Sequence, residues 1–323
     1  MVLAMTLILS ALLCGVYLKI ALRLQILDQP NQRSSHTRPT PHGGGVPLLV
    51  ALGVGMATAG VAWPGPYLLL MALAAGLAAL GVLDDLRGLS VRLRFSLYSL
   101  GCVLAVLVIQ NPLVNPSLTG LAVALVSAFA LLWMLNLYNF MDGIDGYAAT
   151  QCIIACACAA LLAWGQGAAG HYLLFCLLLA AAQVGFLCWN WPTARLFMGD
   201  AGSIPTGFLL GALALLGHAQ DYLPLACWLI LLAVFITDAT VTLLWRILTG
   251  QAFAQAHRLH AYQRLSRHLG GHLPVVLLLL ALNGLWLFPL AWASAVFPKY
   301  SILLVILAYL PLLGGMAKAR KFS

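Results

Sequence analysis

The chain is a succession of long apolar segments separated by short polar or glycine- and proline-rich stretches. A membrane-spanning helix needs about 20 mostly apolar residues, and such segments recur along the whole chain. The apolar runs are continuous, whereas the strands of a membrane barrel alternate apolar and polar residues. The pattern predicts an all-α, polytopic integral membrane helix bundle of about 10–11 spans, with candidate spans at 2–22, 46–63, 66–83, 95–110, 118–138, 147–164, 171–188, 203–219, 222–246, 274–296 and 300–317.

The composition agrees with a membrane protein. Hydrophobic residues make up 63% of the 323 residues and charged residues only 7%, whereas soluble domains carry about 25% charged residues. These values exclude an ordinary cytosolic enzyme, a disordered chain and a small secreted scaffold. The eight cysteines all lie in apolar runs, which is typical of small packed side chains rather than of a disulfide framework or a metal site.

The charged residues sort to one side of the predicted membrane. With the N-terminus outside and eleven crossings, 15 of the 16 lysines and arginines fall on one face, and only Lys299 falls on the other. Positive residues favour the cytoplasmic face. We therefore expect a periplasmic N-terminus, a cytoplasmic C-terminus and a single domain over 1–323 with cytoplasmic loops at 23–45, 84–94, 139–146, 189–202 and 247–273.

Six of the eight aspartates belong to the same cytoplasmic face, and the chain has no glutamate. Attraction to anionic lipid explains part of the arginine content of that face, but such a surface repels aspartate. The aspartates therefore indicate chemistry at this boundary.

The adjacent pair Asp84-Asp85 closes the third predicted span. Two neighbouring carboxylates at a membrane boundary repel each other and lose hydration, and a bound cation would remove that cost. A helix end stabilised by the following arginines is the alternative. The first loop is basic and hydroxyl-rich, carries Arg38 and ends in three glycines, so it could wrap a phosphate group.

The segment 136–146 is the strongest local signal. Asn136 and Asn139 are three residues apart, as are Asp142 and Asp145, so each pair would share one face of a helix. Further along the chain, Asp200 lies beside glycines just before the eighth predicted span. Asp200 is suited to bind a hard cation or to cap the helix.

The last cytoplasmic loop reads His257-Arg258-Leu259-His260-Ala261-Tyr262-Gln263-Arg264. On a helix the two histidines would share one side. Zinc binding would need more ligands than this loop holds, so phosphate contact and proton handling are favoured over it. A basic interfacial helix is the alternative. We expect no special role for His171, His218 and His272, which lie near span ends.

Together, the five cytoplasmic segments resemble the polyprenyl-phosphate N-acetylhexosamine-1-phosphate transferases (glycosyltransferase 4 family), over roughly residues 34–264. The resemblance implies that undecaprenyl phosphate attacks the β-phosphorus of a UDP-activated amino sugar in the bacterial inner membrane, with the active site facing the cytoplasm. The products would be undecaprenyl-pyrophosphoryl-sugar and UMP. The implied cofactor is Mg²⁺, for which Mn²⁺ could substitute.

The resemblance also implies residue roles. Asp200 and Asp84 would bind the metal, and Asp84, Asp85 and His260 would be catalytic. The implied nucleotide-binding residues, with Phe197 stacked on uracil, are Asn139, Asp142, Asp145, Asn190 and Phe197. The implied phosphate-binding residues are Arg38, Arg195, His257, Arg258 and His260. Asp238 and Arg246 fit the ninth span of the family.

Two departures concern the last loop. His257 stands where many relatives have aspartate, and Tyr262 stands where they have the final histidine. This form resembles the branch that begins O-antigen synthesis on 6-deoxy amino sugars such as FucNAc or QuiNAc. No lysine follows the acid pair at ten residues, and Arg92 and Arg94 are its nearest substitutes. The sugar therefore stays open among GlcNAc, GalNAc, FucNAc and QuiNAc.

Two other classes of protein compete with the enzyme. A secondary transporter also places aspartates in broken helices, but near the membrane midplane and between repeats, whereas here they lie at one boundary and no repeat is visible. A non-catalytic assembly scaffold would not need these polar spacings. The expected partners are the lipid and UDP-sugar substrates and the bilayer, with no nucleic acid. A homodimer is compatible with the sequence.

Overall fold

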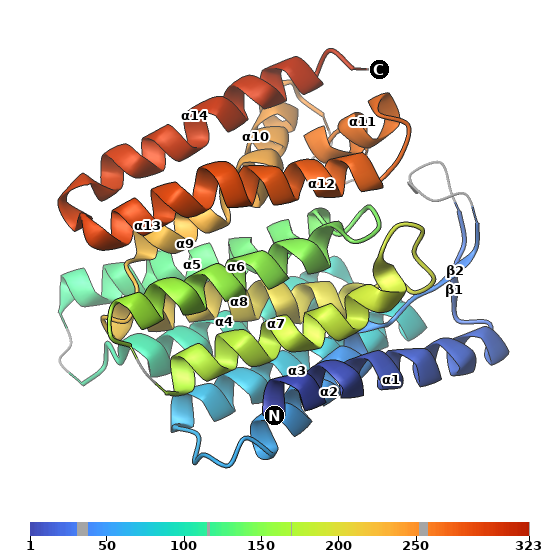
Figure 1. Cartoon of the computed structure of the whole chain (residues 1–323), viewed down its shortest axis with the longest axis horizontal. Coiled ribbons are helices and arrows are strands. Elements are labelled where there is room, and N and C mark those ends of the chain that lie inside the picture. The colour runs from blue at the N-terminus through green and yellow to red at the C-terminus, as the bar shows by residue number, and fades with distance from the viewer. Residues whose placement is uncertain (31–37, 115–116, 169, 252–257, 323) are drawn as a thin grey trace.

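The computed structural model describes residues 1–30, 38–114, 117–168, 170–251 and 258–322. Almost all of its secondary structure is helical (Figure 1). The N-terminal elements are α1 (Val2–Arg23), β1 (Leu27–Asp28), β2 (Thr40–Pro41), α2 (Gly45–Ala57), α3 (Gly65–Arg87), α4 (Val91–Gln110), α5 (Leu118–Phe140), α6 (Tyr147–Gly165), α7 (His171–Asn190) and α8 (Asp200–Ala219). The C-terminal elements are α9 (Leu225–Leu231), α10 (Ala233–Leu248), α11 (Ala261–His268), α12 (Leu273–Leu282), the π-helix η1 (Asn283–Leu287), α13 (Phe288–Val296), the 3₁₀-helix η2 (Pro298–Tyr300) and α14 (Ser301–Ala319).

The structure confirms a polytopic helical bundle. Within the described residues, nine helices are long and apolar enough to cross a membrane, and the bent pair α9–α10 makes a tenth. The shortest predicted span, 95–110, is part of the 20-residue helix α4. The described residues also contain one element outside the all-α prediction, a two-stranded antiparallel pair in which Leu27 faces Pro41.

Two predicted spans differ from the observed helices, one in length and one in continuity. The span expected at 46–63 ends at Ala57 after 13 residues, about 20 Å at 1.5 Å per residue, which is shorter than the hydrocarbon core of about 30 Å. The chain turns at Gly60, whose φ is +71°, and the Trp63 indole N–H donates to the Met56 carbonyl at 2.8 Å. The span expected at 222–246 is not continuous, because α9 and α10 meet at 73°.

Helix α8 lies at the centre of the bundle and is almost wholly buried. Glycines let neighbouring helices approach its N-terminal end. A Cβ atom on Gly45 at the start of α2 would lie 2.1 Å from Gly202 Cα, and one on Gly81 in α3 would lie 2.6 Å from the Ala201 nitrogen. Small residues permit such close backbone contact between membrane helices. The packing therefore brings the ends of α2 and α3 to Asp200.

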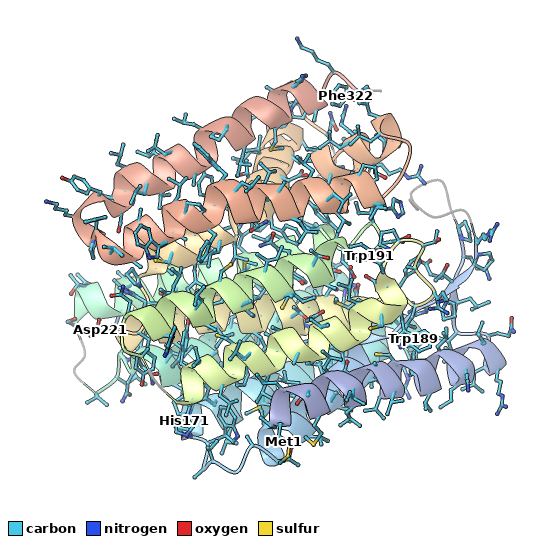
Figure 2. All side chains as sticks on the ribbon, viewed as in Figure 1. Met1, His171, Trp189, Trp191, Asp221 and Phe322 are labelled. Carbon is cyan, nitrogen blue, oxygen red and sulfur yellow. The ribbon has the colours of Figure 1, made fainter. Side chains whose placement is uncertain are left out.

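The polar connections gather at one end of the bundle. Figure 1 shows the loops after α5 and α7, the β1–β2 pair, α11 and the C-terminus at the same end. In Figure 2, Trp189 and Trp191 lie at this end, and Asp221 lies at the opposite end. The helices α12, α13 and α14 form a layer on one side, and α1, α2 and α3 lie on the opposite side. This sorting agrees with the division of charges along the sequence.

Candidate active site

A group of carboxylates lies where α3, α4 and α8 meet. Asp84 and Asp85 are in the last turn of α3, and Asp200 is the first residue of α8. The Arg94 guanidinium contacts the Asp84 carboxylate, and its Nη1 lies 3.9 Å from Asp200 Oδ2. The Leu89 backbone N–H donates to Asp84 Oδ1 at 2.7 Å. One arginine thus stands between the two carboxylates that the sequence suggests as metal ligands.

His42 brings the first loop to the second member of the acid pair. Its Nδ1 lies 3.5 Å from Asp85 Oδ2. The hydrogen bond to Asp85, and the charges of Asp85, Asp28 and Asp200, raise the pKa of His42 above its ordinary 6.5 against the opposing effect of burial. The Tyr17 hydroxyl of α1 donates to the His42 carbonyl at 3.0 Å. The position of His42 is therefore fixed from two sides.

Backbone hydrogen bonds join the first loop to the segment before α8. The Phe197 N–H donates to the Pro41 carbonyl at 2.8 Å, and the Gly44 and Gly45 N–H groups donate to the Phe197 and Met198 carbonyls at 2.9 and 3.0 Å. Two of the predicted motifs are thereby one structural unit, which ends at Asp200.

The segment 141–146 differs from the prediction in conformation. Asp142 and Asp145 do not share a helix face, because α5 ends at Phe140 and α6 begins at Tyr147. Gly146 takes a left-handed conformation with φ +71°, which glycine adopts readily, and the chain turns there. Asn139, still in α5, accepts a hydrogen bond from the Ser203 hydroxyl of α8 at 2.8 Å.

Electrostatic interactions connect this turn with the carboxylate group. Burial, followed by the charges of Asp200 and Asp145, raises the pKa of the half-buried Asp142 well above its usual 3.8. Asp142 is therefore repelled both by Asp145 of the same turn and by Asp200 at the start of α8, and a nearby cation would relieve this repulsion.

The turn is held by side chains from two other segments. The Asp145 carboxylate lies 3.0 Å from His272 Nδ1 and accepts the Ala194 N–H at 3.1 Å. Asn190 accepts the Gly146 N–H at 2.9 Å and donates to the Leu196 carbonyl at 2.9 Å. Asn190 is thus a structural link between the turn and the loop before α8.

A cleft of about 1280 Å³ opens beside this turn. Four of its lining residues are ones for which the sequence predicts substrate contacts, namely Arg38, Asp145, Arg195 and Phe197. His272 lines it as well. The Arg195 guanidinium lies over the Trp189 ring, 4.9 Å from its centroid. A planar cation on an aromatic ring keeps its orientation, so Arg195 offers a directed positive group to an anion in the cleft.

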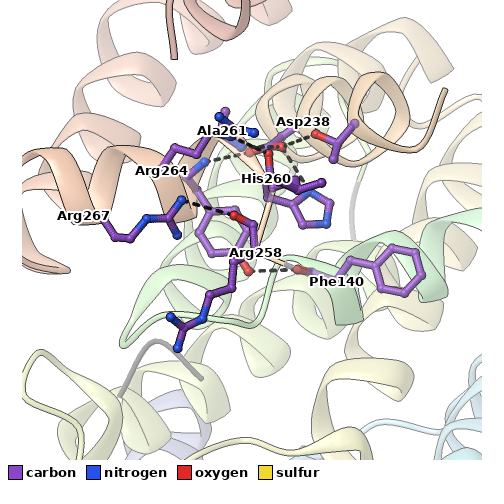
Figure 3. A network of polar contacts seen from close by, with 10 residues as sticks. Phe140, Asp238, Arg258, His260, Ala261, Arg264 and Arg267 are labelled. Carbon is purple, nitrogen blue, oxygen red and sulfur yellow. Dashed lines mark hydrogen bonds and ion pairs between the residues drawn. The ribbon is translucent and has the colours of Figure 1, made fainter. Parts of the chain in front are cut away.

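His260 belongs to a separate buried network (Figure 3). Its Nδ1 lies 3.1 Å from Asp238 Oδ1, and its ring stacks on Phe140 with the centroids 6.3 Å apart. The Asp238 carboxylate also accepts the Ala261 and Tyr262 N–H groups at 3.0 and 2.9 Å. Asp238 of α10 therefore caps α11 from outside the helix.

The expectation that the two histidines of this loop share a helix face is not met as stated. His260 precedes the helix, which begins at Ala261 because Asp238 binds its first N–H groups. His257 lies outside the described residues. Burial raises the pKa of the Tyr262 phenol well above its usual value, and its hydroxyl donates to the Phe140 carbonyl at 2.9 Å. Arg258 accepts a hydrogen bond at its carbonyl from Arg267 at 3.3 Å.

The carboxylate group is compatible with a hard cation. In the described part of the chain, no three His, Cys, Asp or Glu side chains are close enough to hold a metal ion by themselves. Mg²⁺ commonly takes one or two carboxylates and fills its other positions with water and substrate phosphates. Asp84 and Asp200, which share the Arg94 guanidinium, supply such a donor set. The residues fit a cation that arrives with a phosphorylated substrate.

Three residues of the site were not selected from the sequence. His42 lies in the first motif but was not singled out, Arg94 was noted only as a substitute for a missing lysine, and His272 was expected to have no role. Each pairs with an aspartate of another structural element: His42 with Asp85, Arg94 with Asp84, and His272 with Asp145. For His42 the usable signal was its place next to the three glycines, and for His272 there was none.

The fold and the site define a polytopic membrane protein that gathers aspartates, arginines and a polar cleft at one end of its helices. Comparisons with known proteins then specify the family. The profile of glycosyl transferase family 4 matches residues 67–218. The chain is 30% identical over 259 residues to a probable undecaprenyl-phosphate N-acetylglucosaminyl 1-phosphate transferase of Bacillus subtilis (strain 168), covering 76% of this chain and 71% of the relative.

Two further relatives agree. A phospho-N-acetylmuramoyl-pentapeptide-transferase of Granulibacter bethesdensis is 30% identical over 224 residues, or 58% of this chain and 62% of the relative. A decaprenyl-phosphate N-acetylglucosaminephosphotransferase of Mycolicibacterium smegmatis is 26% identical over 313 residues, or 85% of this chain and 76% of the relative. The chain belongs to the polyprenyl-phosphate N-acetylhexosamine-1-phosphate transferase family.

Proposed function

We propose that this protein transfers an N-acetylhexosamine 1-phosphate from a UDP-sugar to undecaprenyl phosphate, at the cytoplasmic face of the bacterial inner membrane. One observation carries the proposal: the first loop joins the carboxylate group of Asp84, Asp85 and Asp200 to a cleft that contains Arg38 and Arg195, because Pro41 lines that cleft and the next residue, His42, contacts Asp85. The names of the relatives and the one-sided charge distribution support it. The reaction would be the first membrane step of O-antigen or related surface polysaccharide synthesis.

The cleft would receive the UDP-sugar. Phe197 offers an aromatic face for uracil, and Asp145 offers a carboxylate oxygen to a ring N–H group. Arg38 and Arg195 lie in the same cleft and carry the positive charge that the two phosphates require. These contacts would place the β-phosphorus toward Asp200, which follows Phe197 by three residues.

The carboxylate group would act at the reacting phosphorus. An oxygen of the lipid phosphate attacks the β-phosphorus, and the bond from that phosphorus to the oxygen shared with the α-phosphate breaks, so that UMP leaves. Asp85, whose carboxylate is held by His42, is placed to take a proton from the lipid phosphate. Mg²⁺, held by Asp84 and Asp200, would neutralise charge on the pyrophosphate when bound.

The position of the site suits a lipid substrate. Asp84 and Asp85 lie in the last turn of α3 and Asp200 is the first residue of α8, so the site lies at the ends of the helices, where a lipid headgroup and a water-soluble nucleotide can meet. A transporter would place such residues near the midplane. The charge sorting along the sequence assigns this end to the cytoplasm.

The test is a UMP-release assay on the purified protein with undecaprenyl phosphate, Mg²⁺ and each of four donors: UDP-GlcNAc, UDP-GalNAc, UDP-FucNAc and UDP-QuiNAc. We expect UMP release that needs the lipid and stops with EDTA, and the preferred donor identifies the sugar. A strong preference for UDP-FucNAc or UDP-QuiNAc would support the O-antigen branch that the last loop resembles. Absence of UMP with all four donors would refute the proposal, and solute uptake by proteoliposomes without UMP release would indicate a transporter.

A further inference from the structure

His272 joins the C-terminal helical layer to the turn between α5 and α6. It is the N-cap residue of α12. Its Nδ1 accepts a hydrogen bond from the Asp145 backbone N–H at 3.2 Å and lies 3.0 Å from Asp145 Oδ2. Both side chains are largely enclosed, with 14% of His272 and 7% of Asp145 exposed. The same carboxylate oxygen accepts the Ala194 N–H at 3.1 Å. One carboxylate thus connects three segments that are distant in sequence.

The remaining surface of this pair faces the cleft. Asp145 and His272 both line it, as does Phe197. Asp145 Oδ2 takes both the histidine and the Ala194 N–H, whereas Oδ1 has no hydrogen-bond partner among the described residues. A carboxylate oxygen of this kind, next to an aromatic ring in a cleft, can accept an N–H group of a bound base.

We propose that His272 is a positioning residue for the donor nucleotide: by contacting both the backbone N–H and Oδ2 of Asp145, it fixes the orientation in which Oδ1 meets the base. The inference rests on the proposed function and adds to it a residue from the C-terminal layer. A buried carboxylate without its partner is costly, so Asp145 would turn toward water or another donor if the imidazole were removed. The nucleotide would then lose a preorganised contact.

The proposal predicts a loss in nucleotide binding rather than in the chemical step. At metal sites, removal of a residue that orients a ligand costs about 10–100-fold in affinity or activity, and we expect an effect near the lower end here. His272→Leu should weaken UMP binding about tenfold and raise KM for the UDP-sugar by a similar factor. The turnover number at saturating donor should stay within about threefold.

The experiment is calorimetric titration of UMP into the purified full-length protein in detergent, at constant Mg²⁺. His272→Asn places an amide group near the position of Nδ1, where it can accept the Asp145 N–H, and should restore most of the affinity. His272→Gln moves the amide group by one methylene and should not restore the affinity. His268→Leu is the matched control, because His268 stacks on Phe322 with centroids 3.9 Å apart and does not line the cleft.

A double-mutant cycle with Asp145→Asn separates positioning from a general structural role. If His272 acts through Asp145, His272→Leu should add almost nothing to the loss caused by Asp145→Asn. Wild-type UMP affinity in both the leucine and the glutamine variant would overturn the inference, as would fully additive losses in the cycle. If the wild-type protein does not bind UMP, the proposed function fails together with it, whereas normal wild-type binding and unchanged variants refute this inference alone.

Discussion

Asp238 of α10 accepts hydrogen bonds from Thr242 and from the start of α11 and pairs with His260, so Asp238→Asn is a sensitive perturbation. The carboxylate is 4% exposed. Its Oδ1 receives His260, Ala261 and Thr242 at 3.1, 3.0 and 3.1 Å, and its Oδ2 receives the Tyr262 N–H at 2.9 Å. An asparagine has only one acceptor oxygen. The best orientation of the asparagine places this oxygen at the position of Oδ1, next to His260, Ala261 and Thr242. Its amide NH₂ then faces the Tyr262 N–H, and two donors oppose each other.

The cost can be worked out from these contacts. Leaving the buried Tyr262 N–H without an acceptor costs about 1–3 kcal/mol, and changing three bonds to a charged acceptor into neutral ones costs about 1 kcal/mol each. Avoiding the burial of a charge offsets part of this sum. We expect the ordered start of α11 to lose about 2–4 kcal/mol of stability, which corresponds to about 30- to 1000-fold in the equilibrium constant for holding His260 in place.

Turnover of Asp238→Asn in the UMP-release assay should fall by up to that factor, with a lower melting temperature. Thr242→Val is the control, because it removes one neutral hydroxyl at 3.1 Å from the carboxylate and should cost about 1 kcal/mol. Turnover of Asp238→Asn within threefold of wild type would refute the reasoning. Equal losses in the two variants would show that packing, rather than the cap on α11, determines the effect.

Three further predictions concern the carboxylate group. Asp200→Asn should lower UMP release by at least about 100-fold while the protein still folds, and retained turnover would remove its metal role. Arg94→Gln should lower the Mg²⁺ concentration needed for half-maximal activity, because Asp84 and Asp200 lose the positive charge that stands between them and competes with the metal ion; an unchanged or raised Mg²⁺ requirement would contradict this. The raised pKa of His42 means that its pairing with Asp85 stabilises the fold fully below pH 6.5 and that this contribution is lost as pH rises through the raised value. His42→Asn should therefore lower the melting temperature at pH 6 but not at pH 9, and equal effects at both pH values would contradict the pairing.

Hydropathy predicted most of the fold because a membrane helix must be apolar along its whole length. The apolar runs predicted spans at 66–83 and 203–219, and the helices extend beyond them, to Arg87 in α3 and from Asp200 in α8. The break between α9 and α10 could not be predicted in this way, since Leu232 lies in an unbroken apolar run without glycine or proline. The direction of a helix depends on its neighbours, and apolar composition does not record it.

The candidate site was predicted in its residue types and only partly in its pairings. Aspartates at one membrane boundary indicate a site for a cation or for a cation-bound phosphate. A carboxylate loses hydration at such a boundary, and a bound cation compensates for that loss of free energy. The partners themselves come from tertiary packing. Asp145 and His272 lie 127 residues apart, and nothing in the local sequence of either residue identifies the other. The helix-face spacing of Asp142 and Asp145 was misleading, since α5 ends before them.

The most direct test of the central claim is the identity of both products. Mass spectrometry of the complete reaction should detect one UMP for each lipid product, and that lipid should carry two phosphates and the sugar. This result requires attack at the β-phosphorus, as the arrangement of carboxylates and cleft predicts. Release of UDP with a lipid that carries a single phosphate would mean attack at the sugar carbon, and it would contradict the account.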